Sequence, residues 1–95
     1  MRGILLSLAG LALFPVASFA AAGDPPPPPA FSATCAICHG ERGEGLAGPT
    51  LRPLAIPAGD VAGVVRSGSG QMPAIPRDQL SDADLATITD WLAQP

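Results

Sequence analysis

The only two cysteines of this 95-residue chain, Cys35 and Cys38, are separated by two residues, and His39, the only histidine, follows directly. A chain of this length forms at most one small domain. Such a domain usually needs a disulfide, a metal or a cofactor in addition to its apolar core. The spacing is compatible with four chemistries: a redox-active dithiol, a zinc site, a structural disulfide and covalent haem attachment.

Haem attachment fits these three side chains best. A thioredoxin-like dithiol needs a βαβ unit, but the sequence has no alternating strand pattern. A zinc site needs a fourth ligand, and no second cysteine or histidine pair exists to supply it. A disulfide between Cys35 and Cys38 would close a very small loop and stabilise little. The motif therefore predicts one covalently bound haem c, with both thiols added to the porphyrin vinyl groups and His39 under the iron.

Met72 is the candidate ligand for the second axial position of the haem iron. Because His39 is the only histidine, bis-histidine ligation within one chain is excluded. Of the two methionines, Met1 belongs to the N-terminal segment, whereas Met72 precedes a proline in a predicted loop. A thioether ligand favours reduced iron and closes the site to small molecules. The alternative interpretation is that Met72 only fills the core.

Residues 1–20 are predicted to be a secretory signal peptide. Arg2 gives a positive start, an apolar run follows, and small residues at Ser18 and Ala20 occupy the positions that a signal peptidase reads. Cleavage is expected after Ala20, or alternatively after Ala22. An uncleaved membrane anchor is the minor alternative. We expect export to the periplasm, where haem c is attached, without stable membrane insertion after cleavage.

The rest of the chain divides into residues 21–29, a predicted proline-rich spacer in polyproline II conformation, and residues 30–95, the predicted haem domain. Five arginines, no lysine and eight acidic residues give a net charge of −3, so nucleic-acid binding is not expected. Apolar residues make up 47% of the chain, but only three phenylalanines and one tryptophan are present. The haem is therefore expected to supply much of the core.

The predicted fold class is all-α, with short helices and loops wrapped around the haem. A short helix is expected over 30–37 and a glycine- and proline-rich loop over 40–53. Asp60 is expected to cap a helix over 61–67, which Gly68 ends.

Ser81 predicts the beginning of the clearest helix, since Asp84 stands three residues later in a capping box. One face of this helix carries an apolar stripe formed by Leu85, Ile88 and Leu92.

Five segments together resemble a small bacterial class I cytochrome c from about Phe31 to Leu92. These segments are CAICHG at 35–40, GEG at 43–45, GPTL at 48–51, RSGSGQMPA at 66–74 and LSDADL at 80–85.

The resemblance implies that N- and C-terminal helices cross, with Phe31 and Trp91 at the crossing, and that the Pro49 carbonyl accepts a hydrogen bond from the proximal imidazole. The first helix of the family normally starts earlier, but here Pro25–Pro28 fill that stretch. We therefore expect a short first helix from about Pro29 and a weaker crossing.

Other residues are candidates for the surroundings of the haem. Arg52 and Arg66 are expected either to pair with haem propionates or to be solvated surface residues. Gln71 is a candidate hydrogen-bond donor to the Met72 sulfur. The aspartates 78, 82, 84 and 90 are expected at the surface. Pocket-lining candidates are Pro49, Leu51, Leu54, Ile56, Val64, Val65 and Ile75.

The expected function is that of a periplasmic monohaem cytochrome that carries single electrons between other redox proteins and catalyses no reaction itself. A chain without lysine should meet its partners through an apolar rim or through basic residues on the partner. One alternative is a haem c subunit of a periplasmic dehydrogenase complex. Another is a haem sensor or enzyme in which Met72 leaves the iron.

Overall fold

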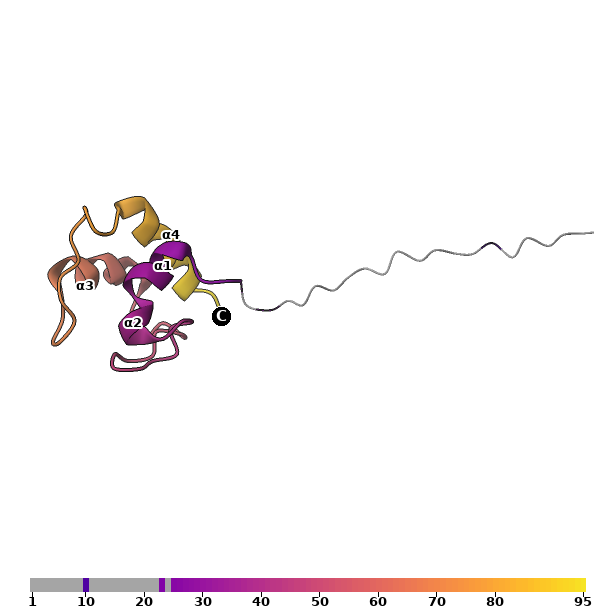
Figure 1. The fold of residues 1–95 in the computed structure, drawn as a ribbon, viewed down its shortest axis with the longest axis horizontal. Coiled ribbons are helices and arrows are strands. Elements are labelled where there is room, and N and C mark those ends of the chain that lie inside the picture. Colours follow the sequence, from indigo (N-terminus) through magenta and orange to yellow (C-terminus); the bar gives the residue numbers. More distant parts are fainter. Residues whose placement is uncertain (1–9, 11–22, 24) are drawn as a thin grey trace, which may run out of the picture.

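The computed structural model describes Gly10, Gly23 and residues 25–95, so the predicted signal peptide, apart from Gly10, and its cleavage site lie outside the residues described. The described part is all-α, as predicted, and its only β-structure is an isolated bridge between Ser69 and Met72 (Figure 1). Its elements are α1 (Pro29–Thr34), α2 (Ala36–His39), the 3₁₀ helix η1 (Ala58–Asp60), α3 (Val61–Ser67) and α4 (Asp82–Leu92).

The helix expected over 30–37 is in fact two short helices that meet at Cys35. Pro29 occupies the first position of α1, where a missing N–H costs nothing. Cys35, with φ −106° and ψ −34°, separates α1 from α2, although its N–H still bonds the Phe31 carbonyl at 2.8 Å. Gly40, with φ 88°, ends α2. The haem motif therefore occupies a bend and one helical turn.

The expected cap of α3 by Asp60 is wrong. Asp60 has helical backbone angles, its side chain makes no capping hydrogen bond, and it belongs to η1. A 3₁₀ turn that begins after Pro57 leads into α3 and makes a separate capping side chain unnecessary. The end of α3 is as predicted, because the N–H of Gly68 bonds the Val64 carbonyl at 2.8 Å.

The beginning of α4 is confirmed by its N-cap. The Ser81 hydroxyl oxygen accepts a hydrogen bond of 3.1 Å from the backbone N–H of Asp84. The predicted apolar stripe is buried together with Trp91, which widens it. This face packs against α1 and α3 and forms the main part of the core, whose buried members are Phe31, Val61, Val65, Ile75, Leu80, Leu85, Ile88, Trp91 and Leu92.

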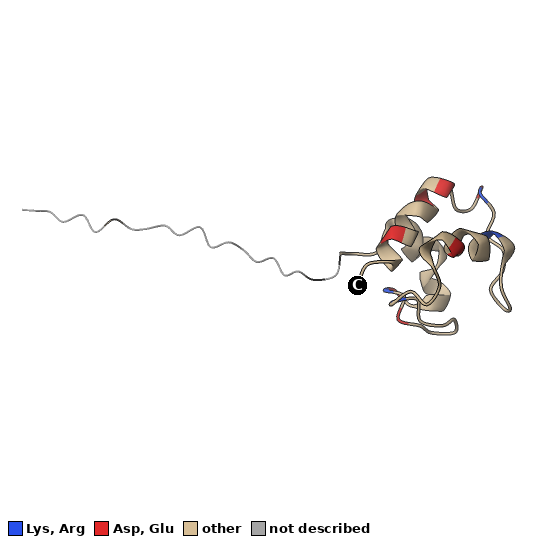
Figure 2. Ribbon diagram, turned by 180° about the vertical axis from the view of Figure 1, so that it is seen from behind, with Lys and Arg blue, Asp and Glu red and all other residues tan. Residues whose placement is uncertain are grey.

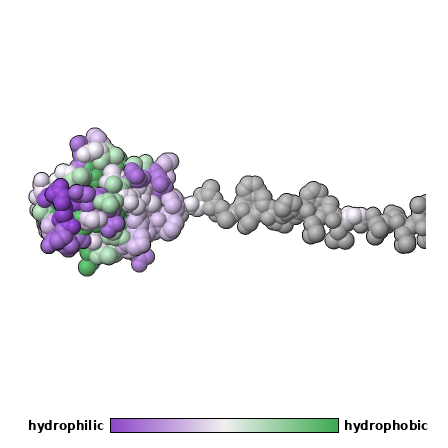
Figure 3. All heavy atoms as spheres, turned by 90° about the horizontal axis from the view of Figure 1, so that it is seen from above, coloured by the Kyte–Doolittle hydropathy of each residue, from purple (hydrophilic) through white to green (hydrophobic). Residues whose placement is uncertain are grey.

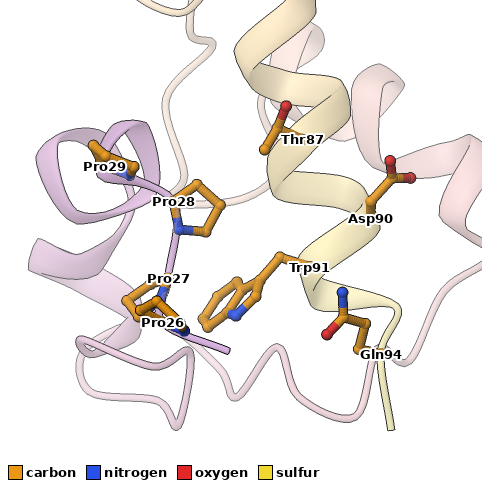
Figure 4. Close-up of a pocket in the computed structure, with 8 residues that line it drawn as sticks. All are labelled: Pro26, Pro27, Pro28, Pro29, Thr87, Asp90, Trp91 and Gln94. Atoms are coloured by element: carbon orange, nitrogen blue, oxygen red, sulfur yellow. The ribbon is translucent and has the colours of Figure 1, made fainter. Parts of the chain in front are cut away.

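The crossing of α1 and α4 is built on an aromatic pair. The ring centroids of Phe31 and Trp91 are 4.8 Å apart and the rings are tilted by 57°, a favourable aromatic geometry. The Trp91 indole N–H donates a hydrogen bond of 3.0 Å to the Pro25 carbonyl. Pro26–Pro29 line a groove of about 420 Å³ beside the same indole (Figure 4). The proline run therefore packs against the crossing where the family would place another helical turn.

Candidate functional site

The two thiols of the haem motif are free and differ in exposure. Cys35 is half-buried and Cys38 is exposed, and they form no disulfide with each other. Burial raises the pKa of the Cys35 thiol. The structure thus leaves both sulfur atoms available for thioether bonds.

His39 is buried and oriented by a single hydrogen bond. The residue is 8% exposed, and Nδ1 of its imidazole lies 2.8 Å from the Pro49 carbonyl oxygen, the contact expected from the resemblance. A carbonyl oxygen can only accept, so Nδ1 carries the proton and Nε2 keeps a free lone pair. This tautomer is the one that a metal-ligating histidine needs.

The loop after α2 folds back onto the haem motif and holds the histidine in place. The N–H of Gly45 bonds the His39 carbonyl and the N–H of Gly48 bonds the Cys38 carbonyl, both at 2.7 Å. A Cβ atom at Gly48 would lie 2.8 Å from Cε1 of His39 and 2.9 Å from its Nδ1. The role of Gly48 was missed by the sequence analysis, although the Gly-Pro dipeptide marked the position.

Met72 lies in the loop between α3 and α4, half-buried and packed against the core. A tight turn surrounds it, with hydrogen bonds of 3.0 and 2.9 Å between the backbones of Ser69 and Met72. Gly68 has φ 78°, and a Cβ there would lie 2.9 Å from the Met72 carbonyl oxygen, so the turn requires glycine. Gln71 is exposed, and its bond to the Met72 sulfur remains a prediction.

The predicted pocket residues fall into two groups. Ile75 and Val65 are buried in the core, and Leu51 and Leu54 are half-buried against it. Val64 is also half-buried, whereas Ile56 is 39% exposed and stands apart from the cluster. Whether these side chains line the haem remains a prediction.

Neither Arg52 nor Arg66 is a solvated surface residue, which was one of the two expectations for them. The Arg66 side chain is only 16% exposed and donates hydrogen bonds to the Ile75 carbonyl and to Asp82. The Arg52 guanidinium lies 4.4 Å from the centroid of the Trp91 ring, in a cation–π contact. Asp82 is exposed as expected, and its hydrogen bonds from Arg66 and Arg77 lower the pKa of its carboxyl group.

These donors suit haem c better than a bare metal ion. In the part of the chain that the structure describes, no three histidine, cysteine or acidic side chains converge on one point. Two thiols beside a correctly oriented imidazole, with a thioether on a separate loop, match covalent attachment and axial ligation of a haem. In Figure 1 the loop that follows α2 lies below α1, and part of the loop between α3 and α4 also extends downward.

Among the charged residues of the chain, acidic side chains outnumber basic ones, eight to five. Asp82, Asp84 and Asp90 place carboxylates along α4 (Figure 2), where the first two also suit the positive end of the helix dipole. Within the residues described, no helix has the length and apolar character needed to cross a membrane.

Comparisons with known proteins agree with this site. The family model described as cytochrome c oxidase, cbb3-type, subunit III, matches residues 27–92. Among solved structures, p-cresol methylhydroxylase with substrate bound is 28% identical, with a TM-score of 0.58 over 67% of this chain and 84% of that one.

Two further solved structures are cytochromes. The c-type cytochrome NirC is 30% identical, with a TM-score of 0.50 over 66% of this chain and 79% of that one. Outer membrane cytochrome F (OmcF) from Geobacter sulfurreducens is 25% identical, with a TM-score of 0.51 over 66% of this chain and 89% of that one. No curated protein matches the chain.

The predicted resemblance to a small class I cytochrome c is therefore confirmed, as are the all-α fold and the covalently bound haem c. The chain belongs to the family described as cytochrome c oxidase, cbb3-type, subunit III, and has the electron-transfer role of a c-type cytochrome.

Proposed function

We propose that this cytochrome is a periplasmic carrier of single electrons between other redox proteins. The observation that carries the proposal is the 2.8 Å contact between His39 and the Pro49 carbonyl, which directs the imidazole lone pair away from the loop, beside two free thiols. The domain organisation that we propose is a signal peptide over 1–20, a proline-rich spacer over 21–29 whose last residues pack against Trp91 and begin α1, and the haem domain over 30–95.

Each site residue has a distinct proposed role. Cys35 and Cys38 would hold the haem through thioether bonds, and His39 and Met72 would ligate its iron. Pro49 fixes the tautomer of His39, and Leu51 and Ile75 contribute apolar surface that keeps water from the iron. Bound haem c supplies a one-electron couple between ferric and ferrous iron. The chain contributes the ligands, the low dielectric and the partner surface.

The proposed partner surface is apolar with an acidic rim. Ile37, between the two attachment cysteines, is 83% exposed, and Leu46 is 69% exposed. Both line one groove of about 690 Å³, together with Glu41 and Glu44. Figure 3 shows one face of the domain, on which hydrophobic residues lie beside hydrophilic ones. This combination suits a partner that presents apolar side chains within a basic rim.

A second candidate function is that of a haem c subunit in a dehydrogenase complex. The likeness to a chain of the p-cresol methylhydroxylase structure favours it. Co-purification in a fixed ratio with a larger catalytic subunit would support this role, whereas a cytochrome recovered only as a monomer would favour the free carrier.

The proposed function is tested by exporting the protein in a host that has haem-ligation machinery. The product should stain for haem on a denaturing gel, and redox titration should give one reversible one-electron wave. Cys35→Ser together with Cys38→Ser should abolish the stain. Haem staining that survives this double substitution would refute the attachment, and a multi-electron wave would refute the monohaem carrier.

A further inference from the structure

Arg66 makes a pair of hydrogen bonds that join three parts of the structure. It lies in the last turn of α3, and its Nη1 donates to the Ile75 carbonyl at 3.0 Å. Its Nη2 donates to Oδ1 of Asp82, the first residue of α4, at 2.7 Å. The Arg66 side chain is only 16% exposed and its bond to the Ile75 carbonyl is partly buried, whereas the carboxylate of Asp82 is 67% exposed, so the bond to Ile75 is the better shielded of the two. We call Arg66, the Ile75 carbonyl and Asp82 the arginine clasp.

The clasp holds one end of the segment that contains Met72. Ile75 is bonded twice to α3, because its N–H donates to the Val65 carbonyl at 2.8 Å while its carbonyl accepts from Arg66. The other end of the segment is held by Gly68, whose N–H bonds the Val64 carbonyl at 2.8 Å. Met72 lies between these two attachments, within the turn closed by Ser69.

Arg77 provides a natural comparison. Its Nε donates to both carboxylate oxygens of Asp82, at 3.1 and 3.0 Å, so it shares the acidic partner of Arg66. However, the Arg77 side chain is 72% exposed, and its hydrogen bonds go to Asp82. Loss of Arg77 therefore removes a surface ion pair, whereas loss of Arg66 also removes one of the two hydrogen bonds that hold Ile75 to α3.

We propose that Arg66 is the positioning residue that keeps Met72 in reach of the haem iron. This inference rests on the proposed ligation by Met72. A thioether is a weak ligand, so its retention on iron depends on how firmly the protein holds the loop that carries it. Removal of the Arg66 side chain leaves Ile75 held to α3 by one hydrogen bond instead of two, which loosens the segment and favours departure of Met72 from the iron. Arg66 touches neither the iron nor a substrate in this role.

The test compares Arg66→Met with Arg77→Met in the full-length haem-loaded protein. Ferric haem with a methionine ligand shows a weak near-red absorption band, and ferrous haem binds carbon monoxide only after the methionine leaves. Arg66→Met should retain covalent haem, lose much of the near-red band and bind carbon monoxide about ten-fold more readily, the scale of effect seen for groups that orient metal ligands. Arg77→Met should match the wild type in both measurements.

Two further variants separate positioning from general loss of stability. Arg66→Lys keeps the charge and one donor group, so it should restore part of the near-red band. Asp82→Asn leaves the bond from Arg66 to Ile75 possible and should have a smaller effect than Arg66→Met. Spectra are recorded well below the melting temperature of each variant, so that unfolding does not contribute.

Unchanged near-red absorption and carbon monoxide binding in Arg66→Met and Arg66→Lys would overturn the inference while leaving the proposed function intact. Equal losses in the Arg66→Met and Arg77→Met proteins would also overturn it, since they would assign the effect to the surface ion pair. A wild type without the near-red band would instead refute ligation by Met72, and the inference with it.

Discussion

The Nδ1 atom of His39 lies 2.8 Å from the carbonyl oxygen of Pro49, ten positions further along the chain. This one hydrogen bond connects the haem motif to the loop after it and determines which imidazole nitrogen is free. The bond depends on the close approach of Gly48 to the ring, since a Cβ at Gly48 would lie 2.9 Å from Nδ1. The site is therefore organised by backbone groups of the loop as well as by the motif itself.

Gly48→Ala should displace the His39 ring and reduce the yield of haem-loaded protein. The added methyl group would lie 2.8 Å from Cε1 of His39, closer than real Cβ contacts allow. The loop must shift to relieve it, which weakens the bond to Pro49. The measurement is the ratio of haem absorbance to protein in the purified product.

Gly63→Ala is the matched control, because a Cβ at this helical position meets nothing within 4 Å. It should load haem normally and stabilise the protein by about 0.5–1 kcal/mol, since alanine is the better helix former. If Gly48→Ala loaded haem as well as Gly63→Ala, the loop would not control the orientation of His39.

Trp91→Phe should lower the free energy of unfolding by about 1–3 kcal/mol. The substitution keeps an aromatic ring against Phe31 but removes the indole N–H that bonds Pro25, and it weakens the cation–π contact with Arg52. Denaturant titration of the haem-loaded protein measures the change. Asp90→Ala, an exposed change on the same turn, should stay within about 0.5 kcal/mol of the wild type. An equally small effect of Trp91→Phe would show that the proline run adds no stability.

The contribution of Asp82 to stability should disappear at low pH. A hydrogen bond from Arg66, followed in size of effect by one from Arg77, lowers the pKa of the Asp82 carboxyl group in the folded protein. Folding therefore favours its ionised form. This stabilisation is complete above the unfolded pKa of about 4 and is lost as the pH falls through the lower folded value. Wild type should therefore be more stable than Asp82→Asn at pH 7, and the difference should shrink below about pH 4. A difference that is constant with pH would contradict ionic pairing of Asp82.

The haem-free chain should be at best marginally folded. The described core contains nine buried apolar residues, of which two are aromatic, and the cofactor is expected to complete it. The protein carrying Cys35→Ser and Cys38→Ser should show a weak helical circular dichroism signal and no cooperative melting transition. A sharp transition matching that of the haem-loaded protein would show that the polypeptide alone forms the core.

The sequence predicted the features that depend on local residue patterns. Ser81 with Asp84 predicted the beginning of α4, and the spacing of Leu85, Ile88 and Leu92 predicted its buried face, because capping and helical periodicity are local. The prediction of Cys35, Cys38 and His39 as a haem motif rests on the same kind of local spacing.

Contacts between distant segments were not predictable in this way. The bonds of Arg66 to Ile75 and Asp82 depend on how α3, the Met72 loop and α4 pack together, and no spacing rule encodes that packing. The contact between Pro25 and Trp91 was not predicted, because a proline run has the same sequence pattern whether it is a free spacer or packs against the domain. The Asp60 prediction failed because a 3₁₀ turn competes with side-chain capping.

The central claim, a closed haem iron held by His39 and Met72 for electron transfer, is tested most directly by exposing the reduced wild-type protein to carbon monoxide at neutral pH. We predict no change in the absorption spectrum of the wild type and ready formation of a carbon monoxide complex in Met72→Ala, which keeps its covalent haem. Ready binding of carbon monoxide by the wild type, or an identical response of both proteins, would contradict the account and favour a haem sensor or enzyme with an open iron.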